Sequence, residues 1–136
     1  KINSCPTFWE DIEPYPWLDE LLDLVSKKNG YNSYVCTSTG ISCPHAASGK
    51  MKWINKYLGG SFKKQFFLTA DKFLLAQPGR ILIDDNDKQC LNFENYGGSA
   101  CQFPQIWGRN HVNRHRKIEY VKERLEEIQL KCFGGK

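Results

Sequence analysis

The chain has 136 residues and a formal net charge of +4, with 40% hydrophobic and 25% charged residues. This length predicts a single domain over residues 1–136, and the composition is typical of a soluble globular protein. The charge is too weak to indicate a nucleic-acid partner, and no apolar run is long enough to span a membrane. The N-terminus has neither an initiator Met nor a signal-peptide core, so we expect a processed chain or a fragment.

The first half of the chain predicts two helices and two short strands. An apolar stripe with i, i+3, i+4, i+7 spacing predicts a helix from Leu18 to Val25, ended by Asn29-Gly30. The β-prone run Ser33–Cys36 predicts a strand that leads into a hydroxyl-rich turn. After a loop expected over Ile41–Ala47, Ser48 is the predicted N-cap of a helix through Leu58. Met51, Ile54 and Leu58 lie on one side of this helix. Phe66–Leu68 predicts the next strand.

The second half opens on the most informative stretch, the apolar run Ile81–Ile83 followed by two acids. A short uninterrupted apolar run predicts a strand buried on both faces, as in a parallel sheet. A short helix over Asp87–Tyr96, a strand over Ser99–Phe103 and a final helix follow, the last with the apolar stripe Ile118, Val121, Leu125 and Ile128. The alternation predicts an α/β fold, Rossmann-like, with a mostly parallel sheet flanked by helices.

The six cysteines point to a reduced, cytoplasmic protein. Cys36 and Cys101 fall inside expected strands, where thiols act as small hydrophobes. A disulfide framework is the second interpretation. A zinc site around Cys43-Pro44-His45 is not favoured, because paired C-x-x-C spacing is absent. The cysteines are Cys5, Cys36, Cys43, Cys90, Cys101 and Cys132.

Distinctive polar groups follow the predicted strands: the hydroxyls Thr37 and Ser38, then Lys72, then the acids Asp84 and Asp85. Each alone has a plain interpretation as a turn or a solvated side chain. Together, at the carboxyl edge of a parallel sheet, they predict a site that binds a phosphoryl group and a divalent cation.

A basic cluster precedes the final helix. Such a cluster would suit a nucleotide phosphate or nucleic acid, but we favour a solvated face because the following helix is rich in Glu. Its members are Arg109, His111, Arg114, His115, Arg116 and Lys117.

These motifs resemble the haloacid dehalogenase (HAD) superfamily, and within it the 5'(3')-deoxyribonucleotidase-like phosphatases. The resemblance runs from about Phe8 to about Trp107. It rests on Val35-Cys36-Thr37-Ser38, Phe67-Leu68-Thr69-Ala70-Asp71-Lys72 and Ile81-Leu82-Ile83-Asp84-Asp85.

The resemblance implies a role for each motif residue. Thr37 would bind the transferring phosphoryl group, with Ser38 as an added contact, and Lys72 would stabilise phosphate and the charge of the nucleophile. Asp85 would be the direct Mg²⁺ ligand and Asp84 its supporting neighbour. The implied function is Mg²⁺-dependent hydrolysis of phosphomonoesters, with (deoxy)nucleoside monophosphates as the expected substrates.

The family's motif I, an apolar strand ending in Asp-x-Asp-x-Thr/Val, has no match upstream of Thr37. We therefore expect an incomplete HAD core that lacks motif I and the cap, with the nucleophilic Asp outside this chain. A complementing N-terminal segment or second chain would supply it, and this chain alone would be inactive. The alternative is a non-catalytic remnant or subunit that binds phosphate, metal or a partner chain.

Overall fold

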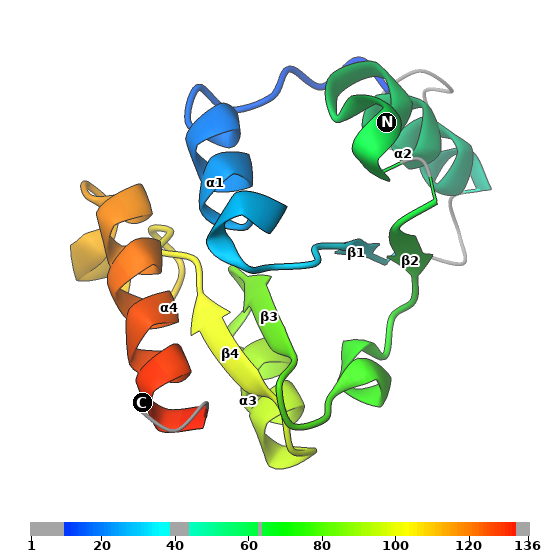
Figure 1. Ribbon diagram of the computed structural model, residues 1–136. Coiled ribbons are helices and arrows are strands. Elements are labelled where there is room, and N and C mark those ends of the chain that lie inside the picture. Colours follow the sequence, from blue (N-terminus) through cyan, green and yellow to red (C-terminus); the bar gives the residue numbers. More distant parts are fainter. Residues whose placement is uncertain (1–9, 39–43, 63, 133–136) are drawn as a thin grey trace. The chain divides into compact units, whose positions relative to one another are not determined.

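The computed structural model of the protein describes residues 10–38, 44–62 and 64–132. It divides into two compact units, Lys1–Ala70 (unit 1) and Asp71–Lys136 (unit 2), which are described separately below (Figure 1). The single domain expected over residues 1–136 stays a prediction. None of the helices in the described ranges has the length and hydrophobicity that crossing a bilayer requires.

Unit 1 is a parallel strand pair connected through a helix. Its elements are α1 (Leu18–Leu24), the 3₁₀ turn η2 (Lys27–Asn29), β1 (Val35–Thr37), α2 (Pro44–Tyr57), the 3₁₀ turn η3 (Gly59–Phe62) and β2 (Phe66–Leu68). Val35 lies opposite Phe66 and Thr37 opposite Leu68. Gly30 ends η2 with a φ of 90°, a left-handed conformation that glycine adopts without a Cβ clash. The first helix and the two strands of unit 1 are therefore confirmed, although β1 begins at Val35 rather than at Ser33. The predicted hydroxyl-rich turn is not confirmed, because Thr37 belongs to β1 and residues 39 and 40 lie outside the described residues.

The start of the second helix was predicted wrongly, because α2 begins at Pro44 rather than after Ser48. Proline suits the first turn of a helix, since its φ is already helical and its missing N–H would be unpaired there. Ser48 lies inside α2, where its hydroxyl donates to the His45 carbonyl at 3.5 Å. Ile54 is buried as expected, whereas Met51 is largely exposed. Residues 41–43 of the predicted loop lie outside the described residues.

Unit 2 repeats this plan with slightly longer strands and a shorter connecting helix. It contains the 3₁₀ turn η4 (Lys72–Leu75), β3 (Ile81–Asp84), α3 (Asp87–Asn95), β4 (Ser99–Gln102), the 3₁₀ turn η5 (His111–Asn113) and α4 (Lys117–Cys132). β3 and β4 pair in parallel, and α3 forms the connection between them. The predicted strands and helices of this half are confirmed, with ends that differ by one or two residues.

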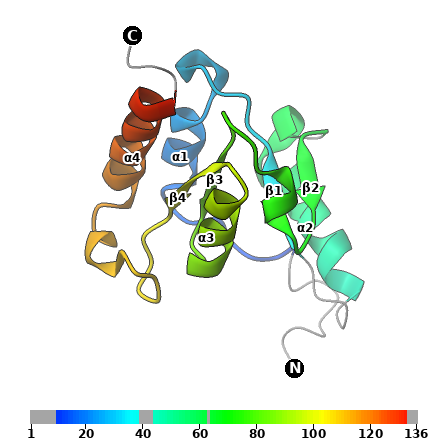
Figure 2. The same ribbon diagram turned by 90° about the horizontal axis from the view of Figure 1, so that it is seen from below.

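The core of unit 2 lies around β4. Ala100 and Cys101 point to opposite faces of the strand and both are buried, so both faces are covered. α3 packs against β3 and β4, and α4 packs against β4 (Figures 1 and 2). The buried stripe of α4 is the predicted one, Val121, Leu125 and Ile128. Each such side chain contributes about 1.5–3 kcal/mol on burial.

One edge of β3 has no hydrogen-bonded strand beside it in the part of the chain that the structure describes. Ser99 N–H donates to Arg80 O at 2.9 Å, and Phe103 N–H donates to Asp84 O at 2.8 Å. The backbone N–H and C=O groups of the even-numbered residues of β3 therefore point toward β4. The backbone groups of Ile81 and Ile83 point the other way, and in the described part of the chain they find no hydrogen-bond partner. Leu82 is buried as predicted, but Ile81 and Ile83 are only half-buried.

The fold class is therefore α/β, as predicted: short parallel strand pairs flanked by helices, in an incomplete Rossmann-like arrangement.

Candidate active site

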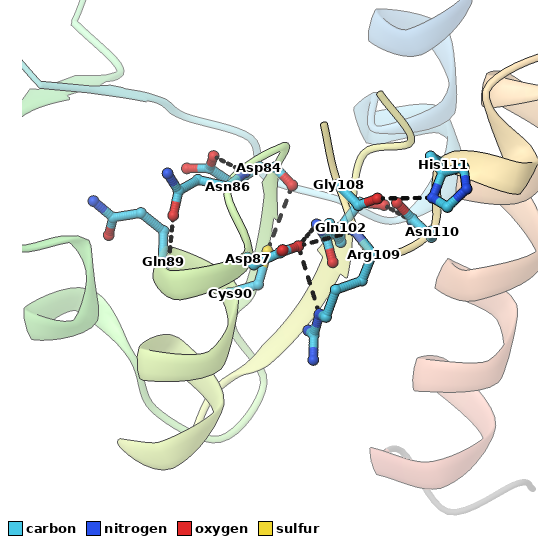
Figure 3. Close-up of polar contacts among 10 residues, drawn as sticks. All are labelled: Asp84, Asn86, Asp87, Gln89, Cys90, Gln102, Gly108, Arg109, Asn110 and His111. Atoms are coloured by element: carbon cyan, nitrogen blue, oxygen red, sulfur yellow. Dashed lines mark hydrogen bonds and ion pairs between the residues drawn. The ribbon is translucent and has the colours of Figure 1, made fainter. Parts of the chain in front are cut away.

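The end of β3 and the start of α3 position the two acids. The strand stops at Asp84, and the Asn86 side chain caps α3 by accepting the Gln89 N–H at 3.0 Å (Figure 3). Asp84 Oδ1 accepts the Asn86 N–H, also at 3.0 Å. The acids are thus held in a tight turn between a strand and a capped helix, at the carboxyl edge of the strand pair.

Lys72 and Asp84 form a nearly buried ion pair. Lys72 Nζ lies 2.6 Å from Asp84 Oδ2, and the two side chains are 13% and 8% exposed. Lys72 begins η4, which lies beyond β2 in the chain, so it does not directly follow a strand as the sequence suggested. Each oxygen of the Asp84 carboxylate therefore accepts one hydrogen bond, Oδ1 from the Asn86 backbone N–H and Oδ2 from the Lys72 ammonium.

Asp85 is the acid whose charge is poorly compensated. Burial raises its pKa above the ordinary value, and the neighbouring Asp84 side chain raises it further through its charge and a hydrogen bond. The Lys72 ammonium acts in the opposite direction but is the weaker influence. A bound cation would relieve this charge, so Asp85 suits a role as a carboxylate ligand to a hard divalent ion.

The described residues do not supply a complete metal site. Among them, no group of three or more His, Cys, Asp or Glu side chains gathers closely enough to hold a metal ion. Asp85 and Asp84 could therefore supply some of the ligands of a cation, and the remaining ligands would have to come from groups other than the described residues.

Thr37 and Ser38 belong to unit 1. Thr37 is the last residue of β1, and the Ser38 carbonyl accepts a hydrogen bond from Lys50 Nζ of α2. Thr37 also lines a largely apolar hollow of about 170 Å³. Its other lining residues are Ile12, Val35, Lys50, Trp53 and Ile54. Lys50 was not anticipated from the sequence, because nothing in the spacing of a helical lysine indicates a contact twelve residues back.

The structure thus brings Lys72, Asp84 and Asp85 together within unit 2. The expectation that Thr37 and Ser38 join them at one edge stays a prediction.

Asp87 has a different role from its neighbours. Its carboxylate accepts a hydrogen bond from the Gln102 side-chain amide and lies 3.5 Å from Arg109 Nε, as Figure 3 shows. This network was not predicted from the sequence. The available signal was Gln102 itself, a polar residue at the end of an apolar strand, which is buried in the structure.

Members of the basic cluster hold the segment before α4 in place. Arg114 donates to His111 O at 2.9 Å, and Lys117 Nζ donates to Pro104 O at 3.0 Å. Arg116 pairs with Glu123 of α4. These contacts agree with a structural role for Arg114, Arg116 and Lys117.

Cysteines in the described part of the chain, namely Cys36, Cys90, Cys101 and Cys132, carry free thiols. Cys5 and Cys43 lie outside the described residues, and with Cys43 the weighed zinc site does too.

Comparison with known proteins gives a distant similarity to nucleotide-hydrolysing enzymes. The human mitochondrial 5'(3')-deoxyribonucleotidase is 30% identical over 85 residues, which cover 62% of this chain and 36% of that protein. The mouse mitochondrial 5'(3')-deoxyribonucleotidase is 27% identical over 85 residues, or 62% and 38% of the two lengths. The chain thus spans little more than a third of the curated relatives it matches. No protein-family model matches it.

Proposed function

We propose that the chain supplies the phosphate-binding and cation-binding residues of a Mg²⁺-dependent phosphomonoesterase that acts on (deoxy)nucleoside monophosphates. The observation that carries this proposal is the nearly buried Lys72–Asp84 ion pair with the poorly compensated Asp85 beside it. Similarity to two enzymes named deoxyribonucleotidases supports the substrate class.

Each residue would have a distinct role in this site. Asp85 would be the direct ligand of Mg²⁺. Asp84, which Lys72 holds in place through the ion pair, would support Asp85 in this role. Mg²⁺, when bound, would neutralise charge on the transferring phosphoryl group. The Lys72 ammonium would attract the substrate phosphate, and the hydroxyls of Thr37 and Ser38 would bond its oxygens.

The nucleophile in this proposal is an aspartate from a segment outside this chain, which would form an aspartyl-phosphate that water then hydrolyses. The unpaired edge of β3 supports this view, because an added strand would satisfy the backbone groups of Ile81 and Ile83. That strand would also carry the missing acids to the edge where Asp84 and Asp85 lie. A cytoplasmic location, expected from the cysteines, stays part of the proposal, although both relatives are named as mitochondrial.

Metal binding is the first test. Mn²⁺ added to the full chain should broaden the NMR signals of residues 84–87 at lower concentrations than signals elsewhere. D85N should abolish the selective broadening. D19N, which removes an exposed acid from α1, should leave it unchanged. Broadening that persists in D85N would overturn the assignment of Asp85.

Catalysis is the second test. The isolated chain with Mg²⁺ should not hydrolyse deoxynucleoside monophosphates, and robust turnover would refute an external nucleophile. The upstream coding sequence separates enzyme from remnant: an apolar strand ending in Asp-x-Asp-x-Thr supports the enzyme, and its absence supports a non-catalytic binding subunit. If such a segment exists, the joined chain should hydrolyse the substrates and its K72M variant should not.

A further inference from the structure

A compact double turn follows β4 in unit 2. Gly108 N–H donates to Gln105 O at 3.0 Å, and His111 N–H donates to Gly108 O at 3.2 Å. Gly108 is buried between the two turns, and a Cβ at this position would lie 2.9 Å from Gln102 Nε2. The backbone at Gly108, in the middle of the double turn, therefore lies against the Gln102 side chain. Any other residue at this position would force the Gln102 side chain or the backbone to move.

Two contacts fix this double turn to the strand and to the start of α3, and a third joins those two elements to each other (Figure 3). Gln102 donates to the Asp87 carboxylate, and the same carboxylate accepts the Arg109 N–H at 3.3 Å. Asn110 Nδ2 donates to Gln102 O at 2.6 Å. The segment is thus held by the ends of both β4 and β3–α3, which makes it a pre-organised support for the side chains that it carries outward.

The outward side chains are an aromatic ring and a guanidinium group. Trp107 is 62% exposed and the Arg109 side chain 63% exposed. They are two residues apart, so their Cα atoms lie within about 7 Å. Arg109 Nε faces Asp87 at 3.5 Å, and the terminal Nη atoms find no partner among the described residues. An exposed tryptophan beside an arginine with free donors is a surface suited to a planar ligand.

The charge of Asp87 decides what kind of ligand fits Arg109. Because the carboxylate offsets the guanidinium charge, a second phosphate is a weaker match than a neutral group with hydrogen-bond acceptors. The terminal Nη groups offer parallel N–H donors, which match the O6 and N7 acceptors of guanine. Adenine presents the N7 acceptor beside the N6 amino group, which is a donor. One guanidinium N–H could therefore bond to N7, while the other would meet a second donor and form no hydrogen bond.

The double turn emerges at the edge that carries the candidate active site. Gln102 is paired in register with Asp84, so the segment leaves β4 beside the end of β3. A nucleotide whose phosphate lies at Lys72 and Asp85 would extend its base along this edge.

We propose that Trp107 and Arg109 form a guanine subsite, in which the indole stacks on the base and the guanidinium reads O6 and N7. This inference rests on the proposed function and deepens it by naming a preferred base. A bidentate arginine–guanine pair corresponds to roughly 5- to 150-fold discrimination against the wrong base.

The test uses nucleosides, which lack the phosphate, so that the base subsite is measured separately. In ¹⁵N NMR titrations of the full chain, guanosine should shift the Trp107 indole and Arg109 Nε signals, and adenosine should bind at least about tenfold more weakly. R109M should lower guanosine affinity to that of adenosine, and W107L should weaken both nucleosides. R80M, which removes an exposed arginine at the amino end of β3, is the matched control and should behave like the wild type.

Equal binding of the two nucleosides, unchanged guanosine binding in R109M or W107L, or no shift with any nucleoside would overturn the subsite. A Trp107 signal that moves with protein concentration alone would instead show that a second copy covers this surface, and would also overturn it. Inorganic phosphate with Mg²⁺ is the separate arm for the proposed function. It should shift the Lys72 signals in the wild type and in R109M alike, so its failure identifies a fault in the phosphate site rather than in the base subsite.

Discussion

Replacing Lys72 by methionine removes one partner of the nearly buried ion pair while keeping the length of the side chain. At the observed 2.6 Å separation, two unit charges attract by about 6 kcal/mol at an effective dielectric constant of about 20. Desolvation offsets part of this attraction, and losing one partner of a buried pair costs about 3–5 kcal/mol. We expect about 3 kcal/mol for K72M, because the Asn86 N–H still donates to Asp84 at 3.0 Å.

Hydrogen exchange measures this cost within unit 2. The amides of Ser99 and Phe103 bond to Arg80 and Asp84 across the strand pair, so their exchange reports on its opening. K72M should speed their exchange by about 100-fold, the rate equivalent of 3 kcal/mol. K88M, which removes an exposed lysine from α3, should have almost no effect, and the K72M/D84N double variant should cost less than K72M alone. Equal exchange in K72M and K88M would refute the importance of the ion pair.

Three further predictions concern the same unit. D85N should match the wild type in stability below pH 3.8, the ordinary pKa of an aspartate, and should become the more stable of the two as pH rises. The reason is that the raised pKa of Asp85 favours the folded state only while this carboxyl is protonated. Thermal melts across pH would contradict this if the difference in stability stayed constant. N86A should destabilise α3 by about 1 kcal/mol through loss of its N-cap, whereas N86S should not, as urea unfolding can show. Burial raises the pKa of Cys90 and of Cys101 to about 12, so both stay protonated and unreactive at pH 8. Iodoacetamide should therefore leave both unmodified in the folded protein and alkylate the exposed Cys132, as peptide mass spectrometry can show.

The strands and most helices could be predicted because local pattern determines them. Ile81–Leu82–Ile83 is too short and too apolar for an amphipathic helix, and the α4 stripe keeps a strict helical spacing that packing against β4 confirms. The start of α2 differs from the prediction because proline is common both in loops and in the first turn of a helix, and here Pro44 begins the helix.

The site was predictable only where its residues are adjacent in the chain. Asp84 and Asp85 follow a recognisable strand, so their position could be inferred. The contacts of Asp87 and Arg109 join residues 22 apart, and no local pattern encodes such a contact. Sequence also could not show that Asp84 is engaged by Lys72 while Asp85 keeps the poorly compensated charge, since burial decides that difference.

The open edge of β3 has a consequence for how the chain behaves at high concentration. An apolar strand with unpaired backbone groups is a template for pairing with another copy, and therefore a site where aggregation can start. The run Ile81–Ile83 is short, and charged residues bound it on both sides: Arg80 before it and Asp84 and Asp85 after it. Charges in these positions act as gatekeepers, because stacking copies in register would bring like charges together. The carboxylates at the end of β3 thus also protect the chain from edge-to-edge assembly.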